Sequence, residues 1–392
     1  MTNDEMILGL PGYQITGMER EKGRLVTSVR YVGPKSCPHC QSSRQRSRGV
    51  YRRLVRHENF GQRHCLLRVE AQRWRCLDCN KQFRQPLPGI LAHQRASEPF
   101  RAAIFQQHLD GINRRRLGRR EGIGAATVER HFRHGLRRKF SEKHGRQCPS
   151  VLGIDEHFFT RKKGFATTLC DLRKRKIFDV VLGRSEASLE AYLQRLEGKK
   201  AVRVVCMDLS STYRAIVRKH FPNARIVADR FHVIRLINHH FLALWRELDP
   251  VASKNRGLVS LMRRHRRNLK PDQQVRLQSY LRKHPALAIT YGFKQRLCHL
   301  LLKKHRTRQQ CVPLVRRLLH SIRHLRTSGL AQMVTLGETL DSWKAEIATM
   351  WRFTKSNGIT EGFHNKMETI SRQAYGFRNF ENYRMRVKVL CG

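Results

Sequence analysis

Three carboxylates are the most informative residues of this chain, because acids are scarce in it. Asp155 and Asp208 each end a mostly apolar run (151–154 and 202–207), and Glu361 lies far downstream. The two runs predict strands, where Asp is depleted and an unpaired buried charge is unfavourable. Carboxylates kept in such places usually hold a cation, and acids around one or two Mg²⁺ or Mn²⁺ ions are used to cut phosphodiesters. The three residues therefore predict metal-dependent chemistry on nucleic acid.

Glu156 competes with Asp155 for the metal, because the two residues are adjacent. Successive residues of a strand face opposite sides of the sheet, so at most one of them enters the site directly, and we choose Asp155. The alternative interpretation of all three acids is that they only pair with the surplus arginines.

The charge of the chain predicts a polyanionic partner. Its 392 residues carry 79 Lys and Arg against 30 Asp and Glu, a formal charge of +49. Such a chain repels itself unless it binds nucleic acid. A basic protein that only packs RNA is the alternative, but the length, the strand pattern and the placement of the acids favour an enzyme. We therefore expect double-stranded DNA as the partner.

Other features of composition bear on the compartment. No apolar stretch approaches the ~20 residues of a membrane span, and the polar start is unlike a secretory signal. The 11 cysteines are an odd number, which favours thiols or metal ligands over a disulfide framework. We expect a bacterial cytoplasmic protein that associates with the nucleoid and not with a membrane.

Two Cys-x-x-Cys pairs predict one structural Zn²⁺ site. They are Cys37 with Cys40 and Cys76 with Cys79. Each pair can form a tight turn that offers two thiolates, and two such turns complete a tetrahedral site. Strands expected over 51–55 and 66–74 suit a zinc ribbon with a small sheet. Free core cysteines or a single redox pair are the alternatives.

Neighbours of the four cysteines refine this prediction. The residue after each turn often needs a positive φ, and here Gln41 and Asn80 stand in place of glycine. His39, His64 and Cys65 are possible extra ligands, but we interpret them as surface or packing residues. The arginines between 44 and 56 indicate that the module docks on DNA.

The segment 113–132 has the layout of a helix-turn-helix. We expect a short helix that ends at Gly122, Ile123 in the core, and a second helix from about Ala125 with Val128 and Phe132 facing inward. An ordinary helical hairpin between domains is the alternative. The side chains expected to face a DNA major groove are Thr127, Arg130, His131 and either Arg133 or His134.

From Val151 the pattern changes to that of an α/β fold. Three strands in a meander are followed by helix, strand, helix and strand, which is the order of an RNase H-like (retroviral integrase-like) sheet. In that topology the first and fourth strands are neighbours, so Asp155 and Asp208 lie side by side. Asp208 then sits at the carboxyl end of a strand, where sites of α/β sheets gather.

A basic helical stretch separates Asp208 from Glu361. It lacks strand alternation, and we interpret it as an all-helical insertion that lies on DNA or at a subunit contact, or else merely presents solvated charges. Glu361 falls in the first turn of a later helix, with Asn365 on the same face. The expected domains are 1–90 with the zinc ribbon, 91–148 with the helix-turn-helix, 149–249 for the first part of the core, 250–350 for the insertion and 351–392 for the C-terminal helices of the core.

Three motifs make the likeness to a known family specific. They are 207–213 around Asp208, 222–233 with Asp229-Arg-Phe-His232, and 357–366 around Glu361 continued by 374–380. Together they resemble the DDE transposases of the ISL3 insertion-sequence family over nearly the whole chain. The resemblance implies that Asp155, Asp208 and Glu361 are the catalytic triad, and that Asp229 and His232 position the scissile strand or buttress the site. Glycine after each zinc turn is the family feature that this chain lacks.

The resemblance also implies an activity. Two Mg²⁺ ions per site would be bridged by Asp155, with Asp208 and Glu361 each completing one. Water as the attacking oxygen nicks the transposon end, and a 3′-hydroxyl joins that end to target DNA. We therefore expect a transposase that binds terminal inverted repeats and acts as a dimer or larger assembly on DNA. A DNA-binding regulator with an inactive core and an RNase H-like nuclease or junction resolvase are the alternatives.

Overall fold

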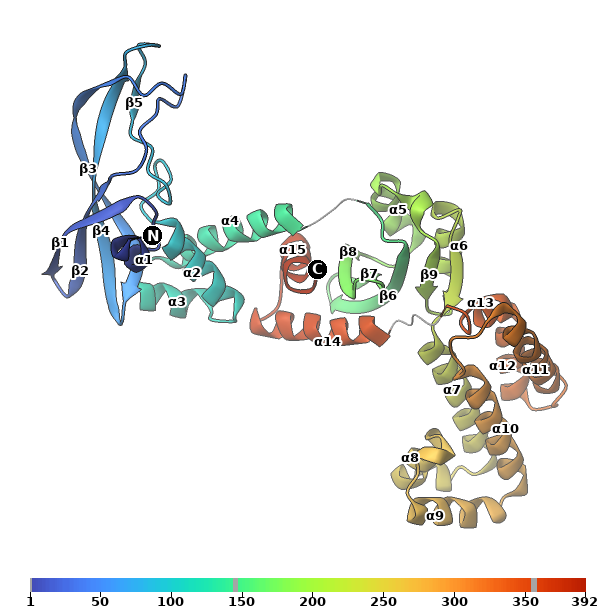
Figure 1. Cartoon of the computed structure of the whole chain (residues 1–392). Helices are drawn as coiled ribbons and strands as arrows, with labels where there is room; N and C mark the ends of the chain where they lie inside the picture. The colour runs from blue at the N-terminus through green and yellow to red at the C-terminus, as the bar shows by residue number, and fades with distance from the viewer. Residues whose placement is uncertain (1, 144–146, 354–357) are drawn as a thin grey trace. The chain divides into compact units, whose positions relative to one another are not determined.

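The structure, a computed structural model, describes residues 2–143, 147–353 and 358–392. The chain forms two compact units, residues 1–142 and 143–392, and each is described by itself (Figure 1). No helix in the described ranges is long and apolar enough to cross a membrane.

The first unit is built on a five-stranded sheet with strand order β1-β2-β4-β3 and β5 paired to β4. Buried and exposed residues alternate along β4, so that Cys65, Leu67, Val69 and Ala71 face one core. This alternation is what a half-buried strand requires. The elements are α1 (Asn3–Leu8), β1 (Tyr13–Glu21), β2 (Arg24–Tyr31), β3 (Gln45–Phe60), β4 (Arg63–Cys76) and β5 (Gln82–Arg84).

The two strands expected between the cysteine pairs exist but are longer than predicted, since β3 and β4 form one extended antiparallel hairpin. The hairpin of β1 and β2 was not predicted at all. Its turn contains Lys22 and Gly23, with φ of 45° and 78°. Two positive φ values in a two-residue connection are typical of the turns that suit the twist of a hairpin. The Lys-Gly pair between two alternating runs was therefore a usable signal.

Three helices complete the first unit: α2 (Glu98–Leu109), α3 (Arg114–Glu121) and α4 (Ala125–Lys143). The side chains of Ser97 and Asn113 cap α2 and α3. Gly122 ends α3 with a φ of 64°. Gly118 is needed because a Cβ there would lie 2.7 Å from the carbonyl oxygen of Ile123. The short helix, the tight turn and the longer second helix agree with the sequence analysis.

The second unit contains a sheet with strand order β10-β9-β6-β7-β8. β6, β7 and β8 form an antiparallel meander, while β9 and β10 join it in parallel. β6 pairs with β9 so that Ile154 is opposite Met207. The expected neighbourhood of the first and fourth strands is therefore confirmed. The elements are β6 (Val151–Thr160), β7 (Gly164–Asp171), β8 (Lys176–Leu182), α5 (Glu186–Arg195), β9 (Val204–Met207), α6 (Ser211–His220) and β10 (Arg225–Ala228).

Helix α15 (Phe380–Cys391) is tied to β8 by a buried charge cluster. Asp179 accepts two hydrogen bonds of 2.7 Å from Arg384 and one of 3.0 Å from Lys388. Burial alone would raise the pKa of Asp179, but these two cations keep it below its usual value. Because a buried carboxylate without partners is costly, the cluster fixes the C-terminal helix on the edge of the sheet.

The described residues between β10 and α14 (Gly358–Gln373) form helices joined by loops and include no strand, as expected. The far ends of α7 and α10 pack with α8 and α9 around their own core, centred on Trp245 and Leu277. Its α-helices are α7 (Arg230–Leu248), α8 (Arg256–Arg263), α9 (Pro271–Arg282), α10 (Pro285–Leu301), α11 (Arg308–Arg326), α12 (Ala331–Ser342) and α13 (Lys344–Thr349).

The return of this helical segment to the sheet is fixed by polar contacts. Glu346 of α13 is buried and bonded to Arg214 of α6 at 3.2 Å. Thr349 donates to the carbonyl of Ile226 in β10 at 2.8 Å. At the start of α7, buried Arg230 donates to the carbonyls of Leu301 and Met350 at 2.8 and 3.0 Å. These contacts determine where the chain re-enters the core.

The Arg230 contacts predict a large loss of stability on substitution. Arg230→Met keeps the volume but removes the donors and leaves buried carbonyls unpaired, so the free energy of unfolding should fall by about 2–4 kcal/mol. Urea unfolding followed by tryptophan fluorescence measures this, because Trp245, Trp343 and Trp351 lie in this unit. Exposed Arg282→Met is the control, and equal stabilities of the two variants would contradict the role of Arg230.

Candidate active site and zinc centre

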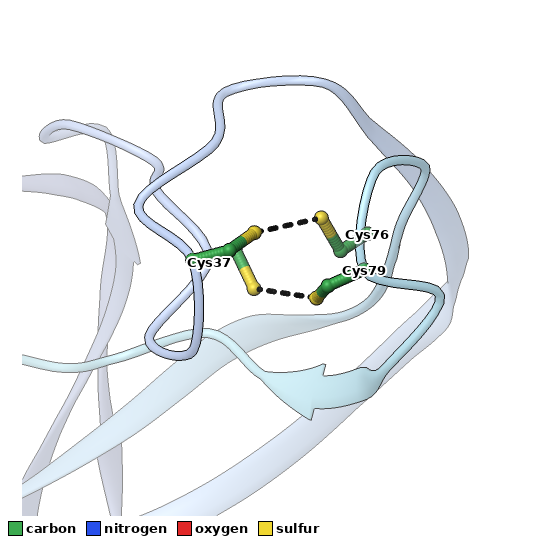
Figure 2. Close-up of side chains that lie close together, drawn as sticks. Cys37, Cys76 and Cys79 are labelled. Carbon is green, nitrogen blue, oxygen red and sulfur yellow. Dashed lines mark hydrogen bonds between the residues drawn. The ribbon is translucent and has the colours of Figure 1, made fainter.

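Four cysteine sulfurs meet in the first unit. The sulfurs of Cys37 and Cys79 are 3.6 Å apart, those of Cys40 and Cys76 are 3.5 Å apart, and all four lie within 4.8 Å of one another. Figure 2 shows the side chains of Cys37, Cys76 and Cys79 turned toward one another. Four sulfurs at ~2.3 Å from a tetrahedral Zn²⁺ would be about 3.8 Å apart. The expected ligands therefore fit one structural zinc ion.

The backbone conformation of the two turns suits metal binding, and backbone N–H groups stabilise the thiolate of Cys76. Gln41 and Asn80 have φ of 62° and 61°, so the expected left-handed positions exist without glycine. Backbone N–H groups of Cys79 and Asp78 lower the pKa of Cys76 to about 6, which favours the thiolate that zinc binds. Cys65 is buried beside Thr27 and is not part of this cluster.

Zinc binding should depend on the four clustered thiols alone. Cys76→Ser should lower the zinc content from about one per chain to near zero after dialysis against a chelator, because three ligands do not hold a structural zinc tightly. Elemental analysis of the purified chain measures this. Cys65→Ser is the matched control and should retain its zinc, and an unchanged zinc content in Cys76→Ser would contradict the assignment.

The second unit brings together Asp155, which lies within β6, and Asp208, which directly follows the end of β9. One residue beyond the Ile154–Met207 pair, their carboxylates lie with the ring of His232 in a group whose ligand atoms are all within 4.8 Å. Asp155 is only 7% exposed. The parallel pairing of the two strands therefore determines that the two carboxylates lie side by side.

His232 and Asp229 support Asp208. The Nδ1 of His232 lies 2.9 Å from Asp229 Oδ2, in hydrogen-bond geometry, and 2.8 Å from Asp208 Oδ1. Burial alone would lower the pKa of His232, but the two carboxylates raise it to about 10. His232 is therefore an imidazolium that compensates the acids, and it is the member of the 222–233 motif nearest to them.

The electrostatics of the acids suit a divalent cation. Burial, together with the charge of Asp208, raises the pKa of Asp155 to about 7. Asp208 Oδ1 is buried, and it is paired with the imidazolium of His232. A bound cation opposes both causes of the raised pKa. Oxygen ligands of this kind are those that Mg²⁺ prefers, so the site fits the expected metal.

A chain of hydrogen bonds lies behind Asp155. It links the hydroxyl of Tyr383 to His157 at 2.9 Å, His157 to Thr168 at 2.9 Å and Thr168 to His364 at 3.2 Å. The Nδ1 of His364 is then 3.9 Å from Asp155 Oδ2. Burial lowers the pKa of His157 to about 3 and that of His364 to about 4, so both rings are neutral.

Because both rings are neutral, all hydrogen bonds of this series must donate in the same direction. Each ring carries a single hydrogen, so donation runs either from Tyr383 toward His364 or back. The first direction leaves the Nδ1–H of His364 facing the carboxylate of Asp155, and the second leaves a lone pair there. Electrostatics favours the first direction. His364, which the sequence analysis did not single out, thus ties α14 to the wall of the site.

Glu361 is placed less directly than the two aspartates. It is exposed in the first turn of α14 and does not belong to the group formed by Asp155, Asp208 and His232. Helix α14 packs against β6, and residues three apart share a helix face, so Glu361 and His364 are on the same side of α14. Asn365 is also exposed on this helix. The roles of Glu361 and Asn365 in the site stay predictions.

Glu156 pairs with Arg184 at 3.3 Å and lines a cavity together with Asp208 and His232. In the first unit, Arg130 and Arg133 of α4 are exposed, Thr127 is partly buried, and His134 is exposed. His131 differs from the expectation that it faces DNA. Its ring is buried edge-on against Phe100, 6.4 Å between centroids, and burial lowers its pKa to about 4. His131 packs the helices and does not reach the surface.

Comparison with known proteins shows the family of the chain. The family model of ISL3-type DDE transposases, described as transposase, matches residues 152–387, so the chain belongs to this family. A second model, described as the zinc-finger of transposase IS204/IS1001/IS1096/IS1165, matches residues 33–79. The transposase for insertion sequence element IS1001 of Bordetella parapertussis is 24% identical over 409 residues, which cover 99% of this chain and 98% of that protein.

Proposed function

We propose that the chain binds the terminal inverted repeats of an insertion sequence and carries out Mg²⁺-dependent cleavage and joining of DNA strands. The observation that carries this proposal is the meeting of Asp155, buried within β6, and Asp208, which directly follows β9, through the parallel pairing of these two strands. Membership of a transposase family supports it. An inactive, DNA-binding derivative has no comparable use for two adjacent acids of which one is buried.

The fold that we propose for the second unit is RNase H-like. The support is the strand order β10-β9-β6-β7-β8, with an antiparallel meander followed by two parallel strands. In this proposal residues 149–249 and 351–392 form one core, and 250–350 form an insertion that supports substrate. α2, α3 and α4, within 91–148, form the helix-turn-helix that follows the zinc ribbon of 1–90.

Each site residue has a stated task in the proposed reaction. Asp155, Asp208 and Glu361 hold two Mg²⁺ or Mn²⁺ ions, which when bound activate the attacking oxygen and stabilise the leaving 3′-oxygen. His232 orients Asp208, and Asp229 orients His232. His364 holds Asp155 and the helix that carries Glu361. Exposed Asn365 positions DNA beside them.

Recognition of the DNA end is assigned to the first unit. Thr127, Arg130 and Arg133 lie on α4, whose buried side is taken by Val128 and Phe132. The zinc-ribbon sheet adds a hollow lined by Tyr51, Arg52, Arg53, Arg73 and Arg84, a suitable surface for phosphates. Transposition couples two ends, so the active assembly is a homodimer or larger on DNA.

We place the protein in the bacterial cytoplasm, on the nucleoid.

Removal of one paired carboxylate should separate binding from chemistry. Asp208→Ala should abolish strand cleavage of a duplex that carries the element's end, because a metal ligand is lost, while leaving end binding intact. A gel assay with Mg²⁺ and with EDTA measures both. The Glu186→Ala variant, which removes a partly exposed acid of α5 that pairs with Lys219, should keep cleaving. Undiminished cleavage by Asp208→Ala would reject the assignment, and a wild-type chain that binds but never nicks would favour the regulator.

Binding should show whether Arg130 contacts phosphates or bases. If Arg130 meets a phosphate, Arg130→Ala should reduce the dependence of log binding constant on log salt by about 0.9. If it reads a base, the variant should lose about 1–3 kcal/mol for the correct end and discriminate ends less well. Fluorescence anisotropy over a salt series tells these apart. Arg20→Ala, on exposed β1 sequence, carries the same charge change, and equal binding by both variants would remove Arg130 from the interface.

A further inference from the structure

A cavity of about 850 Å³ opens beside the paired aspartates. One end is lined by Asp208 and His232, and it extends along one side of α7 as far as Arg263 of α8. Its volume falls within the ~300–1,000 Å³ of pockets that enclose small organic molecules. Of the three acids proposed to hold metal, Asp208 lines the cavity and Asp155 and Glu361 do not, so the greater part of the lining has no task in the metal chemistry.

The lining of this cavity combines two kinds of side chain. Arg235, Arg246 and Arg263 are basic, while Phe231, Ile234 and Leu242 are apolar. Phe231 is 50% exposed although it is a large aromatic residue, and it lies next to His232. Phosphates of a duplex need only charge from a protein, whereas an unstacked base needs an apolar or aromatic surface. The mixture therefore suits an unpaired nucleotide better than the outside of a double helix.

Asn238 supplies a third observation. It lines the cavity, and its side-chain oxygen is buried without a hydrogen-bond partner among the described residues. Leaving a buried amide oxygen unpaired is unfavourable, so a ligand with a donor is the natural partner. Residues 231, 235, 238 and 242 recur at the spacing of one face of a helix. A stacking ring, a cation and an amide are thus aligned along α7.

We propose that this cavity receives an unpaired nucleotide of the DNA strand next to the scissile phosphate. The base stacks on Phe231 and donates a hydrogen bond to Asn238, and the flanking phosphates lie on Arg235 and Arg246. This proposal rests on the proposed function, since that function brings a DNA end to the site. The further claim is that one base at the DNA end is unpaired during cleavage. Phe231 and Asn238 then take the place of the bases that it stacks on and pairs with in the duplex.

Fluorescence of 2-aminopurine tests the unpairing without any cleavage. Each base near the cleavage site is replaced in turn by this analogue, and the full-length chain is added in EDTA. At one position the fluorescence should rise several-fold, because the analogue leaves the DNA stack. In Phe231→Leu and Asn238→Ala most of that rise should be lost. No rise at any position with the wild-type chain, or an undiminished rise in both variants, would overturn the proposal.

Cleavage of mismatched ends gives an independent test. Phe231→Leu should cut a fully paired end about tenfold or more slowly, as expected for a lost base-stacking surface. A mismatch at the unpaired position should restore most of the rate, since the base is already free. Phe231→Trp should cut normally, and Phe158→Leu, an exposed phenylalanine outside the cavity, is the matched control. Equal rates of Phe231→Leu and wild type on paired DNA, or no rescue by the mismatch, would contradict the proposal.

Failure of this inference can be told from failure of the proposed function. If the wild-type chain cuts no end with Mg²⁺, the proposed function fails, and the fluorescence assay, which needs no cleavage, still judges the cavity. If the wild-type chain cuts paired ends but Phe231 and Asn238 affect neither assay, the function stands and the nucleotide pocket is wrong.

Discussion

The parallel pairing of β6 with β9 is the constraint on which the site depends. It places Ile154 opposite Met207, and the next residue of each strand is an aspartate. Two like charges at this spacing, one of them buried, are unfavourable unless positive charge is added. The imidazolium of His232 supplies part of this positive charge. The pKa of Asp155 stays raised in its presence, so a divalent cation would lower the free energy of the site further.

Much of the rest of the second unit can be understood as support for this pair. The hydrogen bonds from Tyr383 through His157 and Thr168 to His364 join α14 and α15 to the distant strands β6 and β7 behind Asp155. Arg230 fixes the helical insertion at the start of α7, just two residues before His232. A long insertion is compatible with an accurate site because both of its ends are anchored by buried polar contacts, whose loss is costly.

The sequence predicts the core well because its signals are local or topological. Alternation gave the meander, the order of elements gave the neighbourhood of Asp155 and Asp208, and paired spacing gave Cys37, Cys40, Cys76 and Cys79. The burial of His131 and the contact of His364 with Asp155 were not predictable in this way. Both depend on how helices rotate against neighbours, Phe100 in one case and β6 in the other, and helical periodicity does not fix that rotation.

The position of Glu361 shows the same limit at longer range. Its helix is predictable, but its distance from the aspartates depends on the insertion and on α14 packing against β6. The hairpin of β1 and β2 was missed for a simpler reason, since its Lys22-Gly23 turn was a local signal that went unused. Local signals thus predict helices and turns more securely than they predict contacts between distant elements.

Titration of the zinc-loaded chain with Mn²⁺, followed by electron paramagnetic resonance, tests the central claim most directly. The account predicts two sites in the wild-type chain, loss of both in Asp155→Asn, and loss or marked weakening of one in Glu361→Gln. Manganese binding that is the same in Asp155→Asn as in the wild type would contradict it.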